Sequence, residues 1–127
     1  MRLLLDTHTF LWFIDDSPQL SQQGKALLEA DNELWLSIAS LWEITIKLRL
    51  GQLTVGMPIE VLMTEHLTRN AIDILPITVA HLIALSTLPL HHRDPFDRLL
   101  IAQAMVEQAP LVSADPAFDA YPVQRVW

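Results

Sequence analysis

The chain has 127 residues and a formal net charge of −7; hydrophobic residues make up 51% of it and charged residues 18%. This balance excludes a disordered chain and is typical of one packed domain, here residues 1–127. The absence of cysteine excludes a disulfide framework, a thiolate metal site and a cysteine nucleophile. The acidic excess argues against a non-specific nucleic-acid binder, which carries a basic surface, but not against an enzyme whose carboxylates hold cations.

The amino-terminal segment has some features of a signal peptide, because Arg2 precedes three leucines. Asp6 interrupts this apolar run, and Asp15 and Asp16 follow soon after, so the pattern does not fit a cleavable leader. No apolar stretch approaches the roughly 20 residues that a membrane span needs. We therefore expect a cytoplasmic protein without a membrane segment.

Short apolar segments alternate with amphipathic ones along the chain. The predicted strands are residues 2–5, 34–37, 72–77, 110–113 and 123–127. The predicted helices are residues 9–14, 21–30 with Ser21 as N-cap, 40–50 closed by Gly51, 58–69 opening on Pro58, 78–87 and 95–108. This alternation predicts an α/β fold, a three-layer sandwich with a central, mostly parallel sheet of four or five short strands flanked by helices.

Acidic residues stand where these elements meet. Asp6 ends the first strand, Glu43 lies near the start of helix 40–50, and Asp115 follows strand 110–113. Asp94 and Asp97 stand at the start of helix 95–108. In an open parallel sheet, strand ends and the helix starts that follow them share one edge, where ligands bind. These acids can therefore converge although they are far apart in sequence.

Each acid taken alone has a structural alternative. Glu43 fits a capping box in the segment Ser40-Leu41-Trp42-Glu43, and Asp94 and Asp97 fit the N-cap and third position of a helix that opens on Pro95. Asp115 before Pro116 fits a turn. Asp6 is the hardest to explain this way, because an ionised carboxylate at the end of a buried strand is costly unless it is paired or bound to metal.

Taken together, the acids predict a metal site. Carboxylates about 5 Å apart repel by roughly 3 kcal/mol per pair at an effective dielectric near 20. Divalent cations would offset this repulsion, and an oxygen-only ligand set favours Mg²⁺ or Mn²⁺. Two such ions can activate a water and stabilise the leaving oxygen in phosphodiester cleavage.

Four segments, LLLDTH, SLWEI with Lys47 following, DPFDRLLIAQA and LVSAD, resemble in order and spacing the motifs of the PIN-domain nuclease family. The start DTHTFLW is similar to that of its VapC-type toxins, which belong to toxin–antitoxin pairs. The resemblance implies a metal-dependent endoribonuclease with one or two Mg²⁺ or Mn²⁺ ions, a homodimer and a cognate antitoxin, with DNA contacted only through the antitoxin. By this resemblance Asp6, Glu43, Asp97 and Asp115 are the catalytic, metal-binding acids, and Asp94 is a cap or an auxiliary acid.

Neighbouring residues have supporting roles under this hypothesis. Thr7 and Ser113 would orient metal-bound water or cap local turns, and His8 would contact phosphate or support an acid. Lys47 would pair with Glu43 or meet a phosphate. The segment His91-His92-Arg93 and Arg98 would form a basic rim around the acids, or else a solvated loop. The large aromatics are core residues or part of a dimer or antitoxin surface: Trp12, Phe13, Trp35 and Trp42.

Other α/β classes fit less well. A receiver domain needs a lysine after a late strand, but the only lysines are Lys25 and Lys47. A haloacid-dehalogenase-like phosphatase needs a second aspartate two residues after Asp6, where His8 stands. With three glycines, the chain carries no P-loop or dinucleotide motif. The alternative from another class is a non-catalytic binding module that holds only the antitoxin and its DNA.

Overall fold

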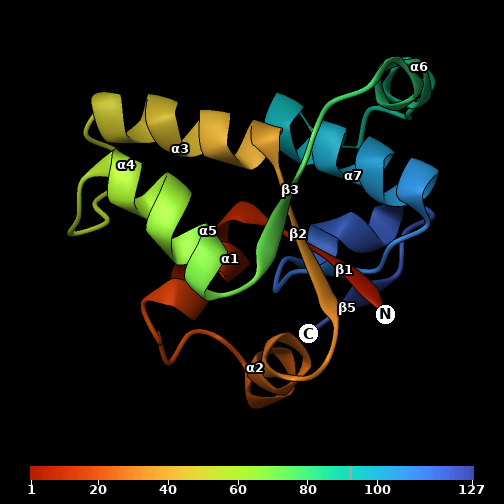
Figure 1. Ribbon diagram of the computed structural model, residues 1–127. Coiled ribbons are helices and arrows are strands. Elements are labelled where there is room, and N and C mark those ends of the chain that lie inside the picture. Colours follow the sequence, from red (N-terminus) through yellow and green to blue (C-terminus); the bar gives the residue numbers. More distant parts are fainter. Residues whose placement is uncertain (92) are drawn as a thin grey trace.

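The computed structural model describes residues 1–91 and 93–127, and in this part of the chain five strands form one sheet. The strands are β1 (Arg2–Leu5), β2 (Glu33–Ser37), β3 (Ile72–Leu75), β4 (Leu111–Val112) and β5 (Arg125–Val126). Their order is β3-β2-β1-β4-β5, and all four pairings are parallel. The predicted α/β sandwich with a parallel sheet is confirmed (Figure 1).

Helices connect the strands and cover both faces of the sheet (Figure 1). They are α1 (Thr7–Ile14), α2 (Gln22–Glu29), α3 (Ile38–Arg49), α6 (Val79–Ser86), α7 (Pro95–Glu107) and the 3₁₀ turn η2 (Pro116–Ala120). The predicted helix 58–69 is one continuous helical segment of three parts: α4 (Ile59–Val61), the π-helical turn η1 (Leu62–His66) and α5 (Leu67–Arg69). Among the described residues, no helix is long and apolar enough to cross a bilayer.

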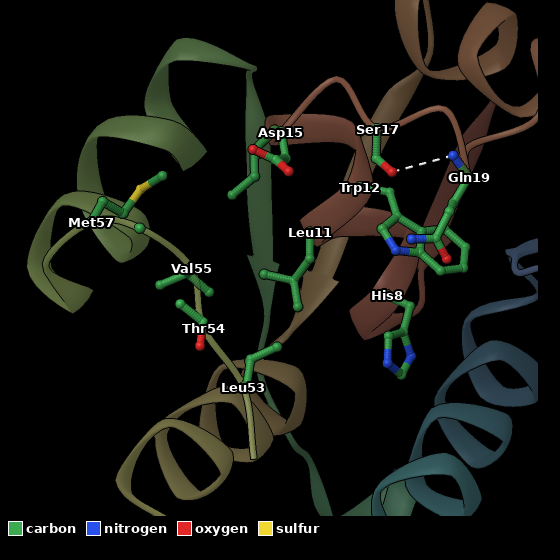
Figure 2. Close-up of a pocket in the computed structure, with 12 residues that line it drawn as sticks. His8, Leu11, Trp12, Asp15, Ser17, Gln19, Leu53, Thr54, Val55 and Met57 are labelled. Carbon is green, nitrogen blue, oxygen red and sulfur yellow. Dashed lines mark hydrogen bonds between the residues drawn. The ribbon is translucent and has the colours of Figure 1, made fainter. Parts of the chain in front are cut away.

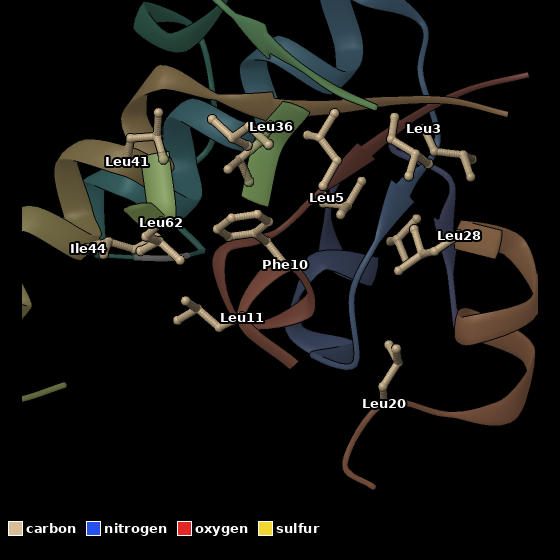
Figure 3. Packing of buried hydrophobic residues seen from close by; sticks show 14 residues of the cluster. Leu3, Leu5, Phe10, Leu11, Leu20, Leu28, Leu36, Leu41, Ile44 and Leu62 are labelled. Atoms are coloured by element: carbon tan, nitrogen blue, oxygen red, sulfur yellow. The ribbon is translucent and has the colours of Figure 1, made fainter. Parts of the chain in front are cut away.

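Successive side chains of the central strand enter two different cores. Leu3 and Leu5 of β1 pack with Phe10 of α1 in one cluster, whereas Leu4 packs on the opposite face with Leu100 of α7. Each of these side chains is essentially inaccessible to solvent, and burial of one leucine contributes about 1.5–3 kcal/mol. Figure 3 shows the first cluster, with Phe10 between the strand leucines and helix α3. A strand buried on both faces explains the continuous leucine run.

Two helices begin earlier than predicted, each directly after its N-cap residue. α1 begins at Thr7, because the Asp6 side chain accepts the Thr9 amide at 2.7 Å. α3 begins at Ile38, because Ser37 is its N-cap and accepts the Ala39 amide at 3.0 Å. Ser40 therefore lies inside α3 and does not form the predicted capping box with Glu43. The predicted N-cap Ser21 is confirmed by its bond to the Gly24 amide.

Helix α6 is fixed on α7 by a buried histidine. His81 is fully buried; its Nδ1 accepts the Thr78 amide and its Nε2 lies 2.9 Å from Oε2 of Glu107. Because Nδ1 accepts, Nε2 carries the proton and donates it to Glu107. Arg2 also contacts Glu107, at 3.2 Å. This connection holds the helix α7, whose amino-terminal end carries two of the candidate acids.

Candidate functional site

The central strands deliver candidate acids to one edge of the sheet. β1 ends at Leu5 and β4 ends at Val112, and these two residues are paired in register. Asp6 follows the first directly, and Ser113 and Asp115 follow the second. The strand order runs outward in both directions from β1, so this edge is the point at which open α/β sheets bind ligands. Parallel topology therefore brings together residues that are more than 100 positions apart.

The helices α3 and α7 bring the other acids to the same place. The two helices lie against each other (Figure 1), with the rings of Trp42 and Phe96 in edge-to-face contact at 5.2 Å. Glu43 is one residue after Trp42, and Asp97 is one residue after Phe96. One cleft of about 100 Å³ results, lined by Asp6, Thr7, His8, Glu43, Lys47, Asp94, Asp97, Asp115 and Phe118. All five predicted acids line it, and we call it the acidic cleft.

Asp6 is the N-cap of α1, which is one of the two roles that the sequence suggested for it. It is 8% exposed, and one carboxylate oxygen caps α1. The other oxygen, Oδ2, accepts a hydrogen bond from the hydroxyl of Ser113, and that hydroxyl accepts the amide of Asp115 at 3.1 Å. Ser113 thus links the ends of β1 and β4 and fixes the orientation of the Asp6 carboxylate in the cleft.

Glu43 is held on both sides. It is only 3% exposed; its Oε1 accepts the Thr7 hydroxyl at 2.7 Å and its Oε2 accepts Lys47 Nζ at 2.5 Å. The hydrogen bond with Glu43 raises the pKa of Lys47, and the charges of Glu43, Asp94 and Asp97 add to it, against the effect of burial. Lys47 is therefore a positive charge inside the acidic cleft.

Asp94 and Asp97 differ in their surroundings although they belong to the same helix start. Asp94 is the N-cap of α7 and accepts the amide of Phe96 at 2.9 Å, with Pro95 at the first helical position. Asp97 is half-buried, and burial raises its pKa to about 7, with further contributions from the charges of Asp94, Glu43, Asp6 and Asp115. Every other acid of the cleft is thus close enough for its charge to act on Asp97.

The arginines of the predicted basic rim, Arg93 and Arg98, do not line the acidic cleft. Arg98 donates to the carbonyls of Pro89 and Leu88 and, together with Arg93, lines a separate pocket beside Leu90. His91 packs edge-to-face on Tyr121 at 5.2 Å. His92 lies outside the described residues. Lys47 and His8 are the basic residues among those that line the acidic cleft.

The sequence did not predict two features, the contribution of η2 to the cleft and the contact between His81 and Glu107. Phe118 lines the cleft from η2, and Asp115 caps that turn by accepting the Ala117 amide at 3.0 Å. The segment Asp115-Pro116 contained a signal for it, because aspartate before proline is typical of a helix start as well as of a turn. The His81–Glu107 contact had a weaker signal, a Thr-x-x-His spacing that matches a capping box with histidine in the place of glutamate.

The donor set fits a hard divalent cation. The acids of the cleft offer only carboxylate oxygens, which Mg²⁺ and Mn²⁺ prefer. Burial, and after it repulsion by the other acids, raises the pKa of Asp97. Within residues 1–91 and 93–127, however, no three carboxylate or imidazole side chains are already assembled as a ligand group. The cleft therefore has the chemistry of a metal site without a preformed cage.

Comparison with known proteins identifies the family. The family model of the PIN domain matches residues 3–124, so the chain belongs to the PIN domain family. No curated protein matches the sequence significantly.

Solved structures with the same fold include toxin–antitoxin complexes. VapBC2 from Rickettsia felis, bound to a DNA fragment from its promoter, matches with a TM-score of 0.74 at 18% identity over 99% of this chain and 98% of that one. VapBC-1 from nontypeable Haemophilus influenzae matches with a TM-score of 0.68 at 15% identity, over 99% and 97%. FitAcB from Neisseria gonorrhoeae matches with a TM-score of 0.66 at 20% identity, over 98% and 96%. At these identities the likeness shows the fold.

Proposed function

We propose that this PIN-domain protein is a metal-dependent endoribonuclease that acts as the toxin of a type II toxin–antitoxin pair. One observation carries the proposal: five carboxylates from separate parts of the chain line one cleft at the ligand-binding edge of a parallel sheet. Structural likeness to the VapBC and FitAcB proteins supports the toxin assignment. The RNA substrate and the antitoxin are part of the proposal, with DNA contacted only through the antitoxin.

The chain's own residues supply positioning and charge. Asp6, Glu43, Asp97 and Asp115 would hold one or two Mg²⁺ or Mn²⁺ ions, as the family resemblance implies. Bound ions of this kind lower the pKa of water and neutralise charge on the phosphodiester. Ser113 holds Asp6, whereas Thr7 and Lys47 hold Glu43.

Asp94 acts on this site through the backbone. Its carboxylate holds the first turn of α7, and it therefore fixes the position from which Asp97 projects. We assign it a positioning role. Arg98 stays a weaker candidate for phosphate contact, because its guanidinium is bonded to the carbonyls of Leu88 and Pro89.

We also propose that the protein forms a homodimer through α6. This helix contains no Asp, Glu, Lys or Arg, and Val79, Leu82 and Ile83 are 72%, 49% and 63% exposed. A helix with so much exposed apolar surface is typical of one that packs against another chain. Ile83→Glu should convert a dimer into a monomer in multi-angle light scattering, whereas Thr68→Glu, at an exposed position of α5, should leave the mass unchanged.

The first experiment is cleavage of a labelled RNA pool by purified, antitoxin-free protein with Mg²⁺, with Mn²⁺ and with EDTA. Wild type should cleave only with metal, and Asp6→Asn and Asp97→Asn should lose at least a hundredfold in rate. Asp31→Asn, an exposed acid outside the cleft, should retain full activity. Circular dichroism should show the same fold for all of them. Equal cleavage by Asp97→Asn would indicate a contaminating nuclease, and a folded protein that cleaves nothing would favour the non-catalytic binding module.

A further inference from the structure

A second hollow lies directly beside the acidic cleft. We call it the α1 groove; it has a volume of about 390 Å³, in the range of ligand pockets. One wall is α1, with Leu11 and Trp12, and the facing wall is the segment that carries Leu53, Val55 and Met57 (Figure 2). His8 lines both the α1 groove and the acidic cleft, so the two hollows adjoin at this residue.

Polar side chains accompany this apolar floor. Asp15, Ser17, Gln19 and Thr54 line the groove together with the apolar residues, and Figure 2 shows Asp15 at the opposite end from His8. None of the lining residues is lysine or arginine. Apolar walls, hydrogen-bonding groups and no cation suit the uncharged part of a nucleotide, its base, and disfavour a phosphate. A purely apolar occupant would displace water from these polar side chains and would offer them no hydrogen bonds in return.

The aromatic residues suit a base as well. The ring centroids of His8 and Trp12 lie 5.7 Å apart, and the ring of Trp127 lies 5.9 Å from that of Trp12. Proteins bind the bases of single-stranded RNA by stacking them on such rings and by hydrogen bonds to their edges. His8 and Asp15 are seven residues apart on α1, which corresponds to about 10 Å along a helix. One nucleotide is of about that length from its phosphate to the pairing edge of its base.

Asp15 determines which base edge fits. It is exposed and stands at the carboxyl end of α1, where both its own charge and the helix dipole are negative. Such a position favours N–H donors. Guanine presents two adjacent N–H groups on its pairing edge, which a carboxylate can accept together, and none of the other RNA bases does so.

We propose that the α1 groove binds a guanine next to the scissile phosphate and so determines the cleavage sequence of the enzyme. This inference rests on the proposed ribonuclease function. Asp15 accepts the two N–H groups, Trp12 stacks on the ring, and His8 lies toward the phosphate. Nucleotide selection is thus placed in a groove separate from the carboxylates that perform the chemistry.

The test compares RNA oligonucleotides that differ in one base at each position flanking the cleaved bond. For wild type, guanine at one position should raise kcat/KM about tenfold or more over the other bases, as a bidentate base contact does. Inosine, which lacks the exocyclic amino group, should lose most of this advantage. Asp15→Asn should cleave the guanine and inosine substrates at rates within about threefold of each other. Asp16→Asn is the matched control, because Asp16 pairs with Lys25, and it should keep the wild-type preference.

The outcomes separate the two proposals. No cleavage of any oligonucleotide by folded wild type overturns the ribonuclease function itself. Metal-dependent cleavage with the same guanine preference in Asp15→Asn as in wild type, or with no base preference in wild type, overturns the groove assignment alone and leaves the groove to another occupant, such as a peptide. Binding of the guanine and inosine oligonucleotides to Asp97→Asn, measured by anisotropy, should show the same discrimination without turnover.

Discussion

Replacement of Asp97 by asparagine should stabilise the metal-free protein at neutral pH. In the folded protein its pKa rises from 3.8 to about 7, first because of burial and then because of the charges of Asp94, Glu43, Asp6 and Asp115. The folded state therefore binds a proton that the unfolded state has already released between about pH 4 and pH 7. Stability contributed by this proton is present below that window and is lost as the pH rises through it. Asparagine carries no charge at any of these pH values, so the variant does not lose this stability as the pH rises.

The size of the effect follows from the same values. A rise of the pKa from 3.8 to about 7 corresponds to at most about 4 kcal/mol, at 1.36 kcal/mol per pKa unit. Asp97 is only half-buried, so solvent screens part of this energy. The charge of Asp97 also interacts favourably with the amino terminus of α7. This interaction contributes about 0.3–1 kcal/mol and is lost in the variant. We therefore expect Asp97→Asn to raise the free energy of unfolding by about 1–2 kcal/mol at pH 8 and by much less at pH 5.

Urea denaturation in EDTA from pH 5 to pH 8 measures this directly. Wild type should lose stability with rising pH, and the variant should show a flatter dependence. Asp31→Asn, an exposed acid outside the cleft, controls for the change in net charge. If wild type and Asp97→Asn had parallel pH profiles, the carboxylates would not be electrostatically coupled, and the electrostatic argument for a cation site would fail.

Three other predictions concern the surroundings of the site. Mg²⁺ or Mn²⁺ at a hundred times its dissociation constant should stabilise wild type by about 2.7 kcal/mol and should stabilise Asp97→Asn less, as thermal melts would show. Ser113→Ala should reduce RNA cleavage at least tenfold and cost about 1–3 kcal/mol in urea denaturation, because the hydroxyl bonds both Asp6 and the Asp115 amide. The hydrogen bond from His81 and then the hydrogen bond from Arg2 lower the pKa of Glu107, so its contribution to stability is present above about pH 4.5 and lost as the pH falls. Glu107→Gln should cost about 0.5–1.5 kcal/mol at pH 7 and less at pH 4, and equal losses at both would contradict this assignment.

The sequence predicted the fold because its signals were local and repeated. Apolar strands alternate with amphipathic helices, and a leucine run such as residues 3–5 is typical of a strand buried on both faces. The predicted start of α3 was wrong because two serines could each serve as its N-cap. Ser37 and Ser40 can both cap a helix, and the end of β2 at Ser37 decided between them. The π-helical turn at Leu62–His66 has no signal in the sequence.

The placement of the acids in one cleft was predictable for a different reason. Parallel topology puts the carboxyl ends of all strands at one edge, and the strand order then places β1 beside β4, so the segments with Asp6 and Asp115 lie close together. The positions of the basic residues depend instead on loop conformation. Arg98 belongs to the same helix as Asp97, yet its long side chain is bonded to the carbonyls of the preceding loop. No spacing rule predicts such a contact.

The capping and the functional interpretations of the acids are compatible, and their combination explains how the fold tolerates so much negative charge in one cleft. Asp6, Asp94 and Asp115 each accept a backbone amide at the start of a helix or helical turn, where the partial positive charge favours a carboxylate. Glu43 is compensated by Thr7 and Lys47 instead. Among the described residues, Asp97 is the acid of the cleft whose side chain accepts no hydrogen bond, and it is also the one whose pKa is raised to about 7. The charge that the protein leaves uncompensated is therefore concentrated on one carboxylate, which is where a bound cation would contribute most to stability.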